Sequence, residues 1–312
     1  MSYRMLGRPK LRDPVLVASW PGIGNIGLIA VDYARKQLDA KACAEIEPWD
    51  FFYPRGISVK AGILEKLNFP SSIFYYKRFK ERDIVFFVGE EQPNEGIRRY
   101  AGGRKAYDMA HIVMEIAKKL GCRRVFTSGA AVSLVHHTTQ PRVWAVTNQE
   151  GLLKEVRHLP NTILMSDVHG RKRQGAISGL NGLLLGVAKE QEMEAFCLMG
   201  EIPVYLQGLM LPYPQASKSV LEVLSLMTGL EVDYGPLDQW ALKIHERVEE
   251  LMEEFSKSLP TQIRKGVTEG LEQLKTPKPS DGQFTGDDAR KAIEEIERFF
   301  KQGGTGDEEG AL

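Results

Sequence analysis

One stretch near the amino end decides the fold prediction: Pro14-Val-Leu-Val-Ala-Ser-Trp-Pro-Gly-Ile-Gly-Asn-Ile-Gly27. Its first half is a short apolar run closed by a proline and glycines, which is the pattern of a buried strand. From residue 25 to residue 38, apolar residues recur at helical spacing. A buried strand, a glycine turn and an amphipathic helix in direct succession predict the first unit of an α/β sheet.

Strand-like and helix-like segments continue to alternate through the first two-thirds of the chain. Strand composition marks residues 41–46, 58–64, 71–79, 83–89, 123–128, 142–146, 161–165 and 195–198. Helical patterns cover residues 97–120, 178–191 and 214–228, with Gly121 and Gly229 as stops, and Thr147-Asn-Gln-Glu150 has the spacing of a capping box. This alternation predicts a three-layer α/β/α sandwich with a mostly parallel sheet.

The carboxyl-terminal quarter of the chain has a different pattern. Gly235-Pro236 opens an amphipathic helix with one apolar stripe, and the helical pattern weakens beyond Pro260. Residues 276–282 read as a linker, residues 285–300 as a short helix and residues 303–312 as an acidic tail. We therefore expect a core domain over residues 1–232, a helical extension over 233–275, and a flexible linker, short helix and tail over 276–312.

Composition narrows the function classes. Lysine plus arginine and aspartate plus glutamate both total 41, so the net charge is zero and no basic patch suggests a nucleic-acid partner. Apolar runs are too short to span a membrane, and the amino end lacks a signal-peptide pattern. Three widely spaced cysteines, Cys43, Cys122 and Cys197, read as reduced buried thiols, which favours a cytoplasmic location.

The glycine turn invites a nucleotide-binding interpretation. Gly22-Ile-Gly24-Asn-Ile-Gly27 is a G-x-G-x-x-G motif between a strand and a helix, and Glu45 or Glu47 follows at about the spacing of a ribose ligand. However, Pro21 removes a backbone donor where a phosphate loop needs one, and the expected second βαβ unit is missing. We favour glycines that serve a sharp turn and tight helix packing, and we expect no cofactor.

Four motifs, in order along the chain, resemble the proteasome assembly chaperone 2 family. They are Trp20-Pro-Gly-Ile-Gly-Asn-Ile-Gly27 with Ala30-Val-Asp-Tyr33, Gly89-Glu-Glu-Gln-Pro93, Thr127-Ser-Gly-Ala130, and Ile177-Ser-Gly-Leu-Asn-Gly-Leu-Leu-Leu185. The resemblance covers roughly residues 10–230. It implies a core like that of purine nucleoside phosphorylases and, for eukaryotic and archaeal members, a chaperone role in proteasome assembly. Some relatives carry labels suggesting a carboxylate–amine ligase.

The family resemblance also raises a question about the tail. Archaeal chaperone members can end in a hydrophobic-tyrosine-any tripeptide that docks between proteasome α-subunits. This chain ends in Gly310-Ala-Leu312, so docking by the tail is not predicted.

Three of these motifs follow strands, so a parallel sheet would bring them to its carboxyl edge, where open α/β sheets bind ligands. The candidate pocket residues are Gly22, Gly24, Asn25, Glu90, Gln92, Thr127, Ser128 and Gly129. Gly179, Gly182 and Gly186 repeat along one helix face and are interpreted as packing residues.

The sequence contains no convincing set of catalytic or metal-binding residues. Ser128 with His136 or His137 and Glu90 is the one constellation that can be assembled, and we interpret the two histidines as a solvated loop pair. Glu90 and Glu91 are adjacent, so they should face opposite ways. One of them could act as a general acid or base, but we favour the interpretation that one caps a helix. We expect no catalytic residue and no metal site, because zinc-ligand spacings are absent.

Two apolar segments predict an interface. One is the aromatic run Trp49-Asp-Phe-Phe-Tyr-Pro54, and the other is the stripe on the helix that begins at residue 235. The candidate interface residues are Trp49, Phe51, Phe52, Tyr53, Trp240, Ile244 and Val248. Such surfaces favour a homo-oligomer, although folding of either segment onto the chain's own core is an open alternative.

The sequence therefore predicts a non-catalytic protein-binding or assembly-chaperone-like protein. The alternative is a small-molecule enzyme, resembling a nucleoside phosphorylase or hydrolase or an ATP-dependent carboxylate–amine ligase, that uses the pocket at the carboxyl edge.

Overall fold

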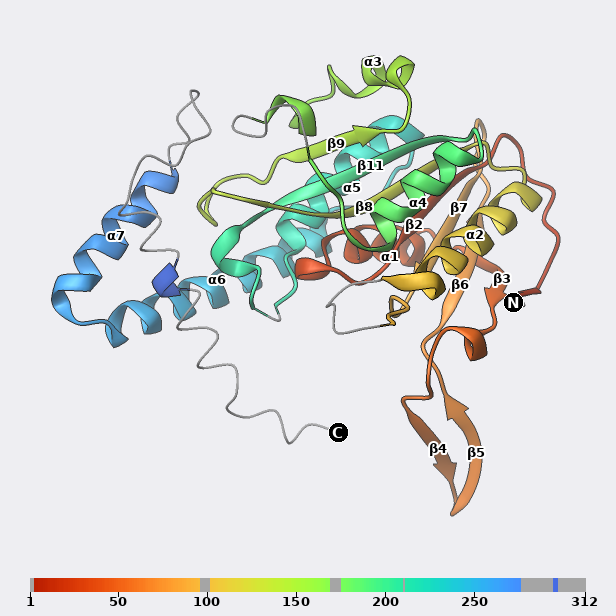
Figure 1. Cartoon of the computed structure of the whole chain (residues 1–312), viewed down its shortest axis with the longest axis horizontal. Helices are drawn as coiled ribbons and strands as arrows, with labels where there is room; N and C mark the ends of the chain where they lie inside the picture. The colour runs from red at the N-terminus through yellow and green to blue at the C-terminus, as the bar shows by residue number, and fades with distance from the viewer. Residues whose placement is uncertain (1–2, 96–101, 169–174, 210, 276–293, 297–312) are drawn as a thin grey trace.

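The computed structural model describes residues 3–95, 102–168, 175–209, 211–275 and 294–296. In this part of the chain, nine strands form one sheet and two more form a separate hairpin, which projects from the body (Figure 1). Across the sheet the order is β1 (Tyr3–Met5), β3 (Lys41–Ile46), β6 (Ser72–Lys77), β7 (Ile84–Gly89), β2 (Val15–Ser19), β8 (Arg124–Ser133), β11 (Glu194–Pro203), β9 (Val143–Thr147) and β10 (Thr162–Leu164).

Helices cover both faces of the sheet, which confirms the predicted three-layer α/β/α architecture. On one face, α1 (Ile26–Gln37), α5 (Pro214–Thr228) and α6 (Gly235–Ser258) share an apolar cluster. On the other face lie α2 (Gly103–Lys119) and α4 (Gly179–Glu190). Strand β2 contributes to both layers, because its alternate side chains, such as Val15 and Leu16, point to opposite faces.

The sheet is parallel at its centre and antiparallel toward the amino-terminal flank. Strands β7, β2, β8 and β11 are parallel neighbours, whereas β6, β3 and β1 are added in antiparallel pairs, and β9 runs antiparallel to β11. The short link between β6 and β7 explains this change, because a parallel pair needs a longer crossover connection. The expectation of a mostly parallel sheet therefore describes the centre.

Two predicted helix stops are confirmed by the backbone. Gly121 follows α2 with φ of 89°, and Gly229 ends α5 with φ of 73°. Both angles lie in the left-handed region that glycine adopts without steric cost.

Residues 58–64 do not form the single strand that was predicted. Instead they span the turn between β4 (Gly56–Lys60) and β5 (Ile63–Asn68), which pair as an antiparallel hairpin. Ala61 and Gly62 form the turn with φ of 50° and 79°, the positive values of a tight hairpin turn. An alanine at the first turn position is an unusual signal, so the sequence did not reveal the hairpin.

The predicted capping box at residues 147–150 is also wrong. Thr147 is the last residue of β9, and its hydroxyl donates to the carbonyl of Gln149 at 2.9 Å. A short 3-10 turn begins at Glu150 and leads into the four-residue helix α3 (Leu153–Val156).

The carboxyl-terminal helices pack onto the body. In α6 the buried side chains are Leu237, Val248, Met252 and Phe255, and α6 packs against α5. Helix α7 (Thr261–Lys275) follows, where the sequence pattern had weakened. The predicted linker, last helix and tail lie outside the described residues, except for residues 294–296, which are helical. None of the helices in the described ranges combines the length and apolarity needed to cross a bilayer.

Candidate functional site

The loops that follow β2 and β7 lie together at the carboxyl edge of the sheet, because the two strands are parallel neighbours. Between them is a hollow of about 460 Å³. The structure thereby brings together five of the predicted pocket residues. The lining comprises Pro21, Gly22, Ile23, Gly24, Asn25, Glu90, Glu91, Gln92, Asn94, Gln207, Leu209 and Leu211.

Internal hydrogen bonds fix the shape of the glycine loop. Gly24 and Asn25 both have positive φ, 60° and 48°. The amide of Asn25 donates to the carbonyl of Gly22 at 2.9 Å, and the side-chain oxygen of Asn25 accepts from the Gly22 amide at 3.3 Å. From the other side, the amide of Tyr213 donates to the Gly24 carbonyl at 2.8 Å. The loop is thus tied both to itself and to the start of α5.

Gly27 sits where α1 passes closest to the sheet. A Cβ atom at this position would lie 2.3 Å from the backbone oxygen of Ser128 and 2.8 Å from the hydroxyl of Ser19. Such distances are far below a van der Waals contact, so only glycine fits without a backbone shift. This geometry supports the packing interpretation of the motif.

Thr127 and Ser128 do not line the hollow. Strand β8 continues to Ser133, so both residues lie inside the strand rather than after its end, and each is 1% exposed. The Ser128 hydroxyl donates to the carbonyl of Leu198 at 3.0 Å, and the Ser19 hydroxyl donates to the Ser128 carbonyl at 3.3 Å. Gly129, in the same strand, is half-buried. The sequence did not predict this strand extension, which depends on full-length pairing with β11.

Gln92 joins the glycine loop to the opposite helical layer. Its amide nitrogen donates to the carbonyl of Pro21 at 2.5 Å, and its oxygen accepts from the amide of Leu180 at 3.0 Å. Leu180 belongs to the first turn of α4, where backbone donors lack partners within the helix. Gln92 therefore holds two structural elements together at the rim of the hollow.

Glu90 and Glu91 interact with the same arginine, so the expectation that they face opposite ways is wrong. Arg55 donates to Glu91 at 2.9 Å and lies 3.6 Å from a carboxylate oxygen of Glu90. Glu90 also accepts from the amide of Ser71 at 3.1 Å. Glu90 therefore accepts a hydrogen bond from the residue that precedes β6, and it does not cap a helix. The spacing of residues in the sequence could not identify Arg55 as its partner.

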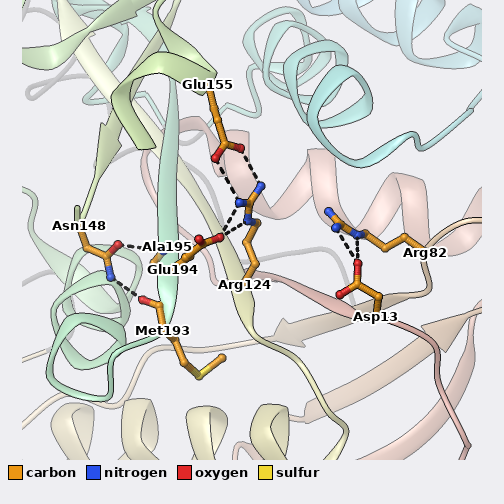
Figure 2. Close-up of polar contacts among 8 residues, drawn as sticks. All are labelled: Asp13, Arg82, Arg124, Asn148, Glu155, Met193, Glu194 and Ala195. Atoms are coloured by element: carbon orange, nitrogen blue, oxygen red, sulfur yellow. Dashed lines mark hydrogen bonds and ion pairs between the residues drawn. The ribbon is translucent and has the colours of Figure 1, made fainter. Parts of the chain in front are cut away.

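The opposite edge of the sheet has its own polar cluster, shown in Figure 2. Arg124, at the start of β8, pairs with Glu155 at 2.7 Å and with Glu194 at 2.5 Å. Asn148 bonds the backbone of Met193 and Ala195 at 2.7 and 2.9 Å. A hollow of about 470 Å³ borders this cluster. The pair of Arg124 with Glu155 joins α3 to the sheet, while Arg82 pairs separately with Asp13 at 2.6 Å (Figure 2).

The two loop histidines are buried, so their interpretation as a solvated pair is wrong. His136 is 6% exposed and His137 is 3% exposed. His137 bonds the hydroxyl of Tyr205 through Nδ1 and Glu249 of α6 through Nε2, both at 2.8 Å. The signal that sequence reasoning missed is the spacing of His245 and Glu249 on one face of α6, with 3.7 Å between them. Ser128 and His137 bond different partners and form no catalytic pair.

Protonation of His136 and His137 destabilises the folded chain, because burial lowers the pKa of both side chains. Burial, together with the neighbouring His137, lowers the pKa of His136 to about 4. Burial also lowers the pKa of His137, although its bond to Glu249 acts in the opposite direction. The Nδ1 atom of His136 accepts from the amide of Thr138 at 3.2 Å, a bond that requires an unprotonated nitrogen.

We expect the free energy of unfolding to fall by about 3 kcal/mol through His136 as the pH drops from about 6.5 to about 4. Between these pH values the unfolded chain binds a proton at His136 and the folded chain does not. The contribution of His136 to the free energy of unfolding is therefore fully present above the unfolded pKa of about 6.5. Urea unfolding at pH 7.5, 6, 5 and 4 measures the slope. His136→Asn retains a hydrogen-bond acceptor near the position of Nδ1 and should reduce the dependence of the free energy of unfolding on pH. An unchanged slope in His136→Asn contradicts this assignment.

The predicted interface residues separate into buried and exposed groups. Phe51 and Phe52 are 4% and 8% exposed and belong to the core of this chain, so the interface prediction is corrected for both. Val248 is likewise buried against the body. Trp49 and Tyr53 are 64% and 87% exposed, and Trp240 is 37% exposed. Ile244 is half-buried beside the first apolar cluster.

Cys43, Cys122 and Cys197 are unpaired and buried, as expected. Burial raises the pKa of Cys43 to about 12 and that of Cys197 to about 11, so these thiols are unreactive at neutral pH. Within the ranges that the structure describes, no three His, Cys, Asp or Glu side chains converge on a point that could hold a metal ion.

The fold and the carboxyl edge place this chain among three-layer α/β proteins that carry a hydrogen-bonded glycine loop between β2 and α1. Residues 16–252 match the PAC2 family, and the chain belongs to that family. The resemblance noted from its four motifs is thereby confirmed.

Solved structures and a related protein sequence agree with this family. Pyrococcus furiosus PbaB, an archaeal proteasome activator, is 25% identical, with a TM-score of 0.67 over 80% of this chain and 98% of that one. Pyrococcus furiosus PbaA, an archaeal homolog of proteasome-assembly chaperone, shares the fold at 23% identity and a TM-score of 0.58, over 81% of this chain and 99% of that one. The uncharacterized protein MJ1210 of Methanocaldococcus jannaschii is 25% identical, over 77% of this chain and 84% of its own length.

Proposed function

We propose that this chain acts without catalysis, as a chaperone-like protein that binds subunits of a proteasome or a related assembly. Membership of the PAC2 family supports this proposal, as does the similarity to PbaB, which is named a proteasome activator. A homo-oligomeric state and a cytoplasmic location are parts of the same proposal. The three buried unpaired thiols support the location, since disulfides are rare in reducing compartments.

The proposal that this chain is not an enzyme is supported by the hydrogen bonds and ion pairs that the polar side chains at the carboxyl edge make with the rest of the chain. Gln92 links Pro21 to Leu180, while Glu90 and Glu91 share Arg55. These bonds hold loops and helices in place. A catalytic site would also need a nucleophile within reach of these carboxylates, and Ser128 of the predicted constellation is buried in β8 and bonds the carbonyl of Leu198.

The alternative is a small-molecule enzyme that uses the same edge. The hollow of about 460 Å³, with its polar lining, favours this second candidate, because it falls within the size range of ligand sites. Its chemistry would have to come from Glu90 or Glu91, each about half exposed.

A thermal-shift screen of nucleosides, nucleotides and amino acids separates the two candidates. A ligand at a hundred times its dissociation constant raises the free energy of unfolding by about 2.7 kcal/mol. We expect no shift of this kind. A clear shift that Glu90→Ala abolishes, and that the exposed Glu65→Ala leaves intact, would contradict the non-catalytic proposal.

A further inference from the structure

The β4–β5 hairpin has one apolar face that the chain itself leaves in water. Ile57 pairs with Leu67 and Val59 pairs with Leu64, and residues directly opposite in a ladder share a face. The register shifts between Ser58 and Val59, so that Glu65 of β5 has no partner residue in β4. This bulge brings both apolar pairs to the same side of the hairpin. The four side chains are 58%, 45%, 58% and 59% exposed, in the order named.

The other face of the hairpin is mixed, because the exposed Ile63 pairs with Lys60 there, next to polar pairs. Ser58 pairs with Lys66 between the two apolar pairs, and the Ser58 hydroxyl bonds the side-chain oxygen of Asn68 at 2.9 Å. An alternating strand of this kind normally turns its apolar face toward a core. Here the hairpin extends away from the body, as Figure 1 shows.

A projecting two-stranded hairpin needs more than its own contacts. In the described part of the chain β4 and β5 pair only with each other, and such an isolated hairpin is marginally stable in water. Its apolar face should therefore be covered for as long as the chain is folded. A second copy of the same chain is always available for this, whereas a transient client protein is not.

We propose that the apolar face of this hairpin packs against the same face of a second copy of the chain, around a twofold axis. The partner's identity rests on the homo-oligomeric state included in the proposed function. Self-packing is electrostatically allowed, because the two apolar pairs carry no charge and Lys66 lies on the other face. The nearby charge of Arg55 is already paired with Glu90 and Glu91.

The available area fits a stable contact. Each of the four side chains exposes on the order of 100 Å², and the exposed Trp49 packs edge-on against Phe69, which directly follows β5, with 4.5 Å between the ring centroids. Two facing copies would then remove roughly 1,000 to 1,200 Å² from water, at the lower limit for specific stable interfaces.

Light scattering after size exclusion, at micromolar concentration, tests the proposal. We expect the wild-type chain at an even multiple of 35.0 kDa, and the double variant Val59→Lys with Leu64→Lys at half that mass or less. Ser58→Lys, on the other face, is the matched control and should keep the wild-type mass. Circular dichroism should show that the body of the double variant remains folded.

The outcomes separate the two proposals. A wild-type mass of 35.0 kDa would contradict both the homo-oligomer and the hairpin contact. An oligomer that the double lysine variant leaves intact would overturn the hairpin contact alone.

Disulfide trapping gives an independent measurement that does not depend on destabilising the hairpin. Under mild oxidation, Val59→Cys should form a covalent dimer, while Ser58→Cys on the opposite face should not. The native thiols do not interfere, because all three are buried. Equal trapping of both variants, or of neither, would contradict the face-to-face arrangement.

Discussion

Replacing Gly27 with alanine is expected to lower the free energy of unfolding by about 3 kcal/mol, the upper part of the usual range for overpacking. The added Cβ would overlap backbone atoms of Ser128, 2.3 Å and 2.5 Å away, and these belong to a central strand that cannot move aside alone. The gain in helix propensity from glycine to alanine, up to about 1 kcal/mol, offsets only part of this cost.

Gly22→Ala is the matched control, because no heavy atom lies within 4 Å of its added Cβ and the backbone there is extended. Denaturant unfolding of the two variants measures the difference directly. If Gly27→Ala unfolds at the same denaturant concentration as Gly22→Ala, the glycine motif does not serve helix packing.

Removing the carboxylate of Glu201 is expected to cost about 3 kcal/mol. Glu201 lies in β11 and is 1% exposed, and it accepts from Arg142 at 2.7 and 3.0 Å and from the indole nitrogen of Trp144 at 2.8 Å. Burial acts to raise the pKa of this carboxyl, but the bonds from Arg142 and Trp144 outweigh it and lower the pKa. Glu201→Ala leaves both donors without this acceptor.

The loss stays at the lower end for a broken buried pair, because the side chain of Arg142 is 43% exposed and can turn toward water. Glu201→Gln keeps an oxygen acceptor and should lose about half as much. Urea unfolding at pH 7 compares the three proteins. Equal stability of Glu201→Ala and wild type would show that this ion pair contributes nothing to folding.

The local patterns that predicted the fold are those whose physics lies within a few neighbouring residues. The apolar run before Trp20 and the glycine stops at residues 121 and 229 each depend on the chain nearby, and the structure confirms them. The β4–β5 hairpin was missed because its turn contains Ala61 in a conformation that alanine seldom adopts.

The candidate site at the carboxyl edge was predicted only in part, because some of its contacts join residues that are far apart in the sequence. Parallel neighbours β2 and β7 bring Gly22, Asn25 and Gln92 together, as the strand pattern implied. By contrast, His137 bonds Glu249, which is 112 residues away along the chain, and Glu90 pairs with Arg55. Contacts at such separations leave no periodic signal in one sequence.

The most direct test of the central proposal is complex formation with proteasome α-subunits from the organism that encodes this chain. The two are mixed at micromolar concentration and examined by size exclusion with light scattering. We expect a stable complex whose mass exceeds that of either component, and we expect it in the presence and absence of added nucleotide. Separate elution of the two components, combined with a nucleotide or amino-acid ligand that stabilises the chain through Glu90, would contradict the proposal.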